Sequence, residues 1–247
     1  WSVEIKGEVN FPGKYAIVAG ETLSSVLERA GGLTEFAYPE GSVFLREDLR
    51  EREREQLNRL ADRIESDLAT LAFQAARFED ANLGQSMGMG QSLLSQLRDS
   101  EPTGRLVIDL PHLLEGSDKT ADLVLKDQDM LIIPQITQEV TVLGEVQYST
   151  SHLIRDGLER DDYIALSGGT TVNADKKRIY VVKANGSVQV GRGGSKWFRS
   201  GTRTSIEPGD TIVVPLDVDR MPSLALWQTS TTIIYNLAIA AAAIGSL

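Results

Sequence analysis

Apolar and polar residues alternate at the start of the chain, where Val3, Ile5 and Val9 are separated mainly by charged residues. A period of two is typical of a strand with one buried face, so the pattern predicts a strand over residues 3–9. Residues 14–18 predict a second short strand, and residues 42–46 a third. A final apolar strand is expected at residues 131–134, after an acidic turn.

Between these strands the spacing of apolar residues changes to that of a short helix. Leu23, Val26, Leu27 and Ala30 recur three or four residues apart, directly after a threonine. Such spacing predicts a short helix with one apolar face. We expect Thr22 to be its N-cap and Gly31 to be the left-handed residue that ends it.

The same pattern occurs twice in the chain. Residues 3–9 (VEIKGEV) return as residues 140–146 (VTVLGEV), and the offset of 137 residues also aligns the Gly-Gly pairs at 31–32 and 168–169. A second match, with an offset of 81, aligns residues 125–134 with 206–215, so the first copy carries 56 additional residues. Each copy predicts a small α+β unit in which one helix covers a mixed sheet.

The repeated glycines and the closing Gly-Asp turn resemble the SLBB module, which has a β-grasp fold. Two such modules followed by an uncharged tail resemble the C-terminal part of the outer-membrane polysaccharide export (OPX) proteins. Those proteins usually begin with a signal peptide and an export domain, and this chain begins with Trp1, so we expect a longer precursor. The residues that carry the resemblance are Gly7, Gly31, Gly32, Gly144, Gly168, Gly169, Gly209, Asp210 and Pro215.

The predicted fold class is therefore α+β, with two tandem β-grasp modules. We expect the first module at residues 1–139, with a helical insertion over 47–103. The second is expected at residues 140–219, and a C-terminal amphipathic or transmembrane helix at 220–247.

The insertion has the pattern of a long, highly charged helix with a narrow apolar face. We expect a loop over residues 84–90 and a second helix over 92–98 that folds back on the first. The apolar face could instead meet a neighbouring subunit or another protein. The residues of this face are Leu57, Leu60, Ile64, Leu68, Leu71, Ala75 and Phe78, each three or four positions from the next.

The last 27 residues, 221–247, contain no charged side chain. Residues 224–247 would span about 36 Å as a helix, which is enough to cross a bilayer core of about 30 Å. Gln228, Thr232 and Asn236 form a polar stripe, and a lone membrane helix has no partner for such a stripe. We therefore expect these three residues to line a pore and Trp227 to lie at the membrane interface. A simple anchor and a helix docked on a soluble core are the alternatives.

Composition narrows the chemistry further. The chain has no Cys and two His far apart in sequence, and no residues with the spacing of a catalytic, metal or cofactor site. The net charge of −10 argues against nucleic acid as a partner. A Gly-rich basic loop could contact headgroups or an acidic polymer, or be an ordinary exposed loop; its residues are Arg192, Lys196, Trp197, Phe198 and Arg199.

The resemblance implies a non-enzymatic function. Proteins of this family form ring-shaped homo-oligomers in the periplasm and outer membrane of Gram-negative bacteria, where they conduct a capsular or extracellular polysaccharide passively. An inner-membrane polysaccharide co-polymerase or export protein is the implied partner, and no cofactor is implied. The alternative is a soluble sugar- or ligand-binding SLBB protein with a C-terminal membrane anchor.

Overall fold

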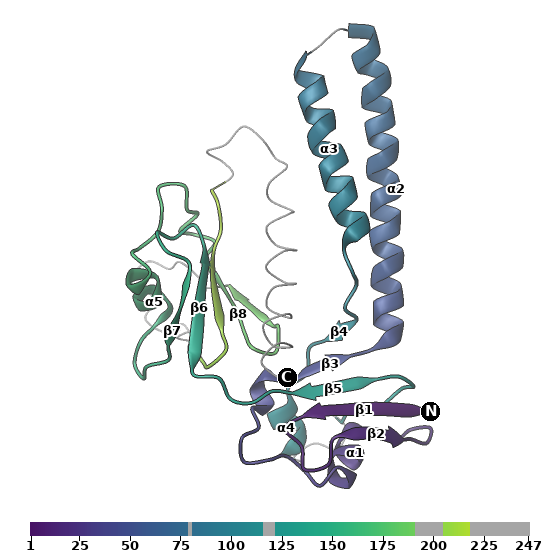
Figure 1. The fold of residues 1–247 in the computed structure, drawn as a ribbon, viewed down its shortest axis with the longest axis vertical. Coiled ribbons are helices and arrows are strands. Elements are labelled where there is room, and N and C mark those ends of the chain that lie inside the picture. Colours follow the sequence, from purple (N-terminus) through teal and green to yellow (C-terminus); the bar gives the residue numbers. More distant parts are fainter. Residues whose placement is uncertain (79–80, 116–121, 191–204, 218–247) are drawn as a thin grey trace. The chain divides into compact units, whose positions relative to one another are not determined.

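A computed structural model describes residues 1–78, 81–115, 122–190 and 205–217 of the chain (Figure 1). The chain divides into two compact units. One contains residues 1–44 together with the described part of 107–247, and the other is Leu45–Leu106. We describe each unit by itself.

The first unit contains two five-stranded sheets, of which the first begins at the N-terminus. Its strands follow the order β2 (Gly13–Ala16), β1 (Ser2–Gly7), β5 (Met130–Ile133), β3 (Val43–Leu45) and β4 (Arg105–Leu106). Strand β1 is antiparallel to β2 and parallel to β5. The helical segments near this sheet in sequence are α1 (Leu23–Arg29), η1 (Pro39–Gly41) and α4 (Leu110–Leu114).

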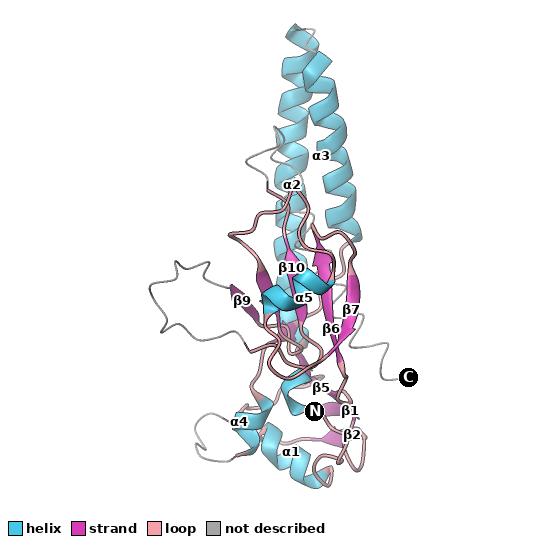
Figure 2. Ribbon diagram, turned by 90° about the vertical axis from the view of Figure 1, so that its left-hand side faces the viewer, coloured by secondary structure: helices cyan, strands magenta, loops and turns pink. Residues whose placement is uncertain are grey.

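The second sheet repeats this topology. Its order is β7 (Thr150–Leu153), β6 (Glu139–Gly144), β10 (Thr211–Val214), β8 (Tyr180–Val182) and β9 (Val188–Val190), and β6 is parallel to β10. Figure 2 shows α5 (Arg160–Leu166) lying across these strands. The predicted α+β class with two similar sheets is confirmed. We call the elements around the first sheet the first module and those around the second sheet the second module.

Each module has a core made from the apolar face of its strands and helix. In the second module, Val140 and Val142 of β6 and Ile212 and Val214 of β10 pack with Tyr163 of α5, and all five are fully buried. In the first module, Val3, Ile5, Leu23, Val26 and Leu27 are buried in the same way. The alternation of apolar residues that predicted β1 and β6 therefore corresponds to their buried faces.

Helix α1 ends as predicted but begins differently. Gly31 has a φ of 78°, and the N–H of Gly32 donates to the carbonyl of Leu27 at 2.9 Å, which closes the helix. Thr22 occupies the N-cap position, but its side chain makes no capping hydrogen bond. The N–H of Leu23 donates instead to the carbonyl of Leu123 at 2.9 Å, so a distant segment of the chain satisfies this end of the helix.

The second unit is a helical hairpin, in which α2 (Glu47–Phe78) and α3 (Ala81–Asp99) lie side by side (Figure 1). Arg98 of α3 and Glu65 of α2 form an ion pair of 2.6 Å between the helices. The loop predicted over residues 84–90 is wrong, because those residues belong to α3. Three glycines in this segment favoured a loop, but Gly90 lies against Leu68 of α2, and this close contact between helices gives it a reason to be helical.

The apolar face of α2 also differs in one position from the prediction. Leu60 is 43% exposed, whereas Ala61 is 3% exposed. Ile64 and Leu68 are half-buried, as is Leu57. The buried line thus runs through 57, 61, 64 and 68, with the spacing of a helix that packs on one partner helix, and Leu60 falls beside this line.

The base of the hairpin is closed by hydrogen bonds within the unit itself. The carboxylate of Glu53 accepts the N–H groups of Thr103 and Gly104 at 3.1 and 2.9 Å. The N–H of Arg46 donates to the carbonyl of Gly104 at 2.8 Å. The chain therefore enters and leaves the hairpin at one closed neck.

Two glycines of α3 provide a test of the hairpin packing. Replacing Gly88, where an added Cβ would meet nothing within 4 Å, with Ala should stabilise the hairpin by about 0.5–1 kcal/mol, because Ala is the better helix former. Gly90→Ala should gain less or be destabilising, since its Cβ would lie 2.4 Å from Cδ2 of Leu68. Thermal melting followed by circular dichroism measures both variants. Equal gains would show that α3 does not approach α2 at Gly90.

Candidate functional site

Most residues predicted to contact membrane or polymer lie outside the described residues. These are the pore-lining candidates Gln228, Thr232 and Asn236, the interface residue Trp227, and the loop residues Arg192, Lys196, Trp197, Phe198 and Arg199. Among the helices that the structure describes, none has the length and hydropathy needed to cross a membrane. Within the same residues, no group of three or more His, Asp or Glu is arranged to hold a metal ion.

The repeated Gly-Glu-Val motif has a structural role in both modules. A Cβ on Gly7 would lie 2.0 Å from the carbonyl oxygen of Ile133, and one on Gly144 would lie 2.1 Å from that of Val214. The parallel neighbours β5 and β10 can approach this closely only because neither residue has a side chain. The N–H groups of the following Glu8 and Glu145 each donate to the same carbonyl at 2.8 Å.

The glutamate of the motif fixes the loop after the helix. The hydroxyl of Thr34 donates to the carboxylate of Glu8, and that of Thr171 to the carboxylate of Glu145, each at 2.5 Å. Both bonds link residues 26 positions apart, so the two modules repeat the interaction at the same place. The motif is therefore a structural device and leaves the search for a functional site elsewhere.

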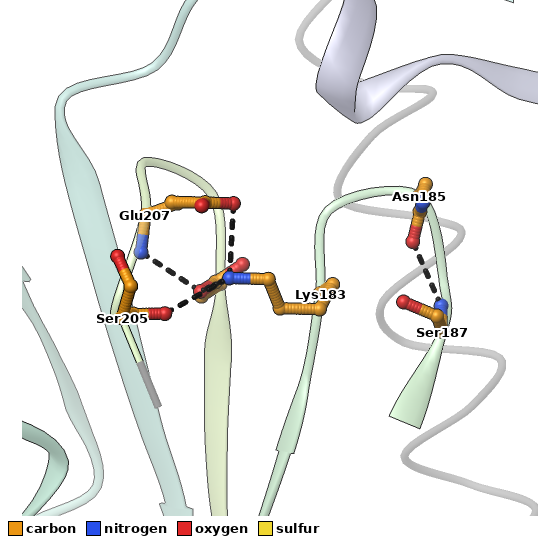
Figure 3. A network of polar contacts seen from close by, with 6 residues as sticks. Lys183, Asn185, Ser187, Ser205 and Glu207 are labelled. Carbon is orange, nitrogen blue, oxygen red and sulfur yellow. Dashed lines mark hydrogen bonds and ion pairs between the residues drawn. The ribbon is translucent and has the colours of Figure 1, made fainter. Parts of the chain in front are cut away.

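The distinctive polar cluster of the second module surrounds Lys183, at the end of β8 (Figure 3). Its ammonium group lies 2.7 Å from Asp210 Oδ2, 2.9 Å from Glu207 Oε2 and 3.1 Å from the carbonyl of Ser205. An ammonium group has three protons, and three acceptors occupy them. Lys183 therefore holds the turn before β10 and has no lone pair with which to act as a base or nucleophile.

Asp210 is the most deeply buried charge in this cluster. Its side chain has no exposed surface, and Oδ2 also accepts the N–H of Glu207 at 2.8 Å. Within the residues that the structure describes, Oδ1 has no hydrogen-bond partner. Burial raises the pKa of Asp210, and the nearby Lys183 ammonium opposes this shift without cancelling it.

Tyr38 of the first module lies next to this turn. Its Cε1 atom is 3.9 Å from the position that a Cβ on Gly209 would occupy, and the residue is 6% exposed. Burial raises the pKa of Tyr38 well above its ordinary value, and the negative charges of Asp210, Glu207 and Glu40 raise it further. The hydroxyl is thus a neutral hydrogen-bond donor at any physiological pH.

A cleft of about 280 Å³ separates the two modules beside these residues. The amide of Asn185 spans it, donating to the carbonyl of Ile108 at 3.3 Å. The wall from the first module comprises Tyr38, Glu40, Ile108, Asp109 and Pro111. The wall from the second module includes Lys183, Asn185, Ser187, Gln189 and Glu207.

Sequence reasoning identified the Gly-Asp turn at residues 209–210 as a motif but did not identify this cleft. One signal was available, because the offset of 137 residues aligns Lys183 with Arg46 and so places a basic residue at the end of the equivalent strand in each copy. Tyr38 gave no such signal, since its equivalent in the second copy is Asp175. The two histidines are also far from a catalytic arrangement: the His152 ring contacts the Ser167 hydroxyl at 2.8 Å, and the His112 N–H caps onto Asp109.

Comparison with known proteins supports the repeat and its resemblance. The SLBB domain family matches residues 2–53 and 140–192, one segment in each module. Two Escherichia coli proteins, each named polysialic acid transport protein KpsD, are 26% identical to this chain over 249 residues. The alignments cover 100% of the chain and 41% of each relative, so the chain spans about two fifths of the length of these relatives. The resemblance to the polysaccharide export family is thereby confirmed, and the chain is a KpsD-like protein with two SLBB domains.

Proposed function

We propose that this chain is part of a component that exports a capsular or extracellular polysaccharide from a Gram-negative bacterium. The observation that carries the proposal is the similarity to KpsD transport proteins over the whole chain, including both modules. The role is non-enzymatic: the acceptors around Lys183 leave it no free proton or lone pair, and neither histidine has a catalytic partner.

The finer proposal concerns assembly and location. We infer a ring-shaped homo-oligomer in the periplasm and outer membrane that acts as a passive conduit, with Gln228, Thr232 and Asn236 facing its aqueous interior. A hydrophilic polymer needs a continuous wet passage, and a closed ring of identical subunits supplies one. An inner-membrane export protein would deliver the polymer. The division into modules at residues 1–139 and 140–219, with a final segment at 220–247, is part of this proposal.

Deletion of the gene tests the export function. In an encapsulated strain that carries it, deletion should remove the polysaccharide from the cell surface while polymer accumulates inside the cell. A plasmid copy should restore export, as should the Gly157→Ala variant, in which the added Cβ meets nothing within 4 Å. Surface polysaccharide that is unchanged by deletion, measured by extraction and immunoblotting, would contradict the proposal.

The oligomer distinguishes the conduit from a soluble sugar-binding protein with a membrane anchor. Particles extracted in detergent should show cyclic symmetry in electron micrographs if the chain forms a ring. A monomer that binds sugar while export continues without it would favour the anchored binding protein instead.

A further inference from the structure

We propose that the cleft between the two modules binds a single neutral sugar residue. The proposal rests on the proposed function, because a polysaccharide is the ligand that an export component meets. It goes beyond that function by assigning a binding site and by excluding acidic sugars from it.

The polar groups of the cleft suit a ligand with several hydroxyls. A sugar hydroxyl both donates and accepts hydrogen bonds, so it needs donors and acceptors close together. The hydroxyl of Tyr38 is a permanent donor, the carboxylate of Glu40 is an acceptor, and the amide of Gln189 is both. Among the described residues, these three side chains make no hydrogen bond with one another or with any other group, and they remain available to a ligand.

The apolar groups of the cleft suit the other face of a sugar ring. Ile108 and Pro111 from the first module and Ala184 from the second contribute carbon surface between the polar groups. Sites for small molecules typically combine such surface with a few fixed polar groups. A volume of about 280 Å³ is at the small end of such sites, which favours one ring over an oligosaccharide.

The charge of the cleft decides which sugars it accepts. Glu40, Asp109 and Glu207 line it, and Asp210 lies directly behind Lys183. Lys183 is the one cationic residue of the lining, and its three protons already contact acceptors of this chain. A carboxylate on the ligand would meet like charges without a free cation, so a uronate or a sialate should be repelled.

Binding by the purified chain tests the proposal. The probes are the methyl glycosides of glucose, galactose, mannose and N-acetylglucosamine, with methyl glucuronide and sialic acid as acidic comparisons. We expect at least one neutral glycoside to bind with a dissociation constant of about 1 mM, as for a weak single-residue site. Chemical-shift titration by NMR measures this affinity, and the acidic probes should give no saturable shift.

Two variants locate the site. Tyr38→Phe removes one hydroxyl and should weaken binding by about three- to tenfold, the usual effect of one lost hydrogen bond. Gln189→Ala should weaken it similarly and lies in the exposed edge strand β9, where it does not affect the core. Tyr180→Phe is the matched control, because Tyr180 is a half-buried tyrosine of β8 outside the cleft and should leave affinity unchanged.

Several results would overturn the assignment. They are an absence of binding by every neutral probe, equal or tighter binding of the acidic probes, or unchanged affinity in both Tyr38→Phe and Gln189→Ala. The gene-deletion experiment has a separate readout. If deletion abolishes surface polysaccharide but the purified chain binds no sugar, the cleft assignment fails and the export function stands.

Discussion

Replacing Gly144 with Ala is expected to unfold the second module or to destabilise it by at least about 3 kcal/mol. The added Cβ would lie 2.1 Å from the carbonyl oxygen of Val214, and the φ of Gly144 is 95°. A left-handed conformation alone costs roughly 1–2 kcal/mol for a residue with a side chain, and a clash with rigid backbone adds to it. Urea unfolding followed by circular dichroism measures the loss.

Gly157→Ala separates the clash from the backbone conformation. Gly157 has a φ of 83°, yet an added Cβ would meet no atom within 4 Å. We therefore expect a loss of only about 1–2 kcal/mol, the cost of the left-handed conformation. Equal losses at positions 144 and 157 would show that β6 and β10 do not approach each other as described. Gly7→Ala should repeat the large effect in the first module, because its Cβ would lie 2.0 Å from the carbonyl oxygen of Ile133.

Replacing Lys183 with Met should cost about 3–5 kcal/mol of unfolding free energy at neutral pH. The substitution leaves the carboxylate of Asp210, which has no exposed surface, without its cationic partner. Removing one member of a buried ion pair typically has this effect because the remaining charge stays desolvated. Lys176→Met is the control, since Lys176 is exposed and should lose about 0.5 kcal/mol or less.

The cost of Lys183→Met should depend on pH in a defined direction. Burial raises the pKa of Asp210, and loss of the ammonium removes an interaction that lowers this pKa. The folded variant therefore holds the Asp210 proton more tightly than the unfolded chain does. The stability linked to that proton is present at acid pH and is lost as pH rises through the folded pKa. Unfolding should thus be closest to wild type at acid pH, and adding Asp210→Asn to Lys183→Met should restore stability at neutral pH. A loss that is independent of pH would contradict the pairing.

The sequence predicted those parts of the fold that depend on local pattern or on the repeat. Alternation along β1 and β6 predicted their buried faces, and the second copy of the pattern predicted a second sheet. Gly31 ends α1 as expected because a left-handed C′ residue is a local feature. The start of α1 was only half predicted, since its first N–H is satisfied by Leu123, about a hundred residues away.

Features set by contacts between distant segments could not be predicted in the same way. Residues 84–90 are rich in glycine and favour a loop, and only contact with α2 at Leu68 gives Gly90 a helical role. The cleft depends on Tyr38 of one module meeting the turn at Gly209 of the other. The repeat offered no guide to this contact, because a feature between two copies has no counterpart within either copy. The burial of Asp210 likewise depends on how the turn packs, which its Gly-Asp sequence does not reveal.

The closed neck of the α2–α3 hairpin makes its length independent of the sheet from which it extends. Hydrogen bonds from Thr103 and Gly104 to Glu53 join the two arms at the base. Residues can therefore be added to or removed from both arms beyond this point while β3 and β4 keep their positions in the chain. Seven further residues in each helix would lengthen the hairpin by about 10 Å, at 1.5 Å per residue. Evolution can thus adjust the reach of this projection as a single variable, with the two SLBB domains unchanged.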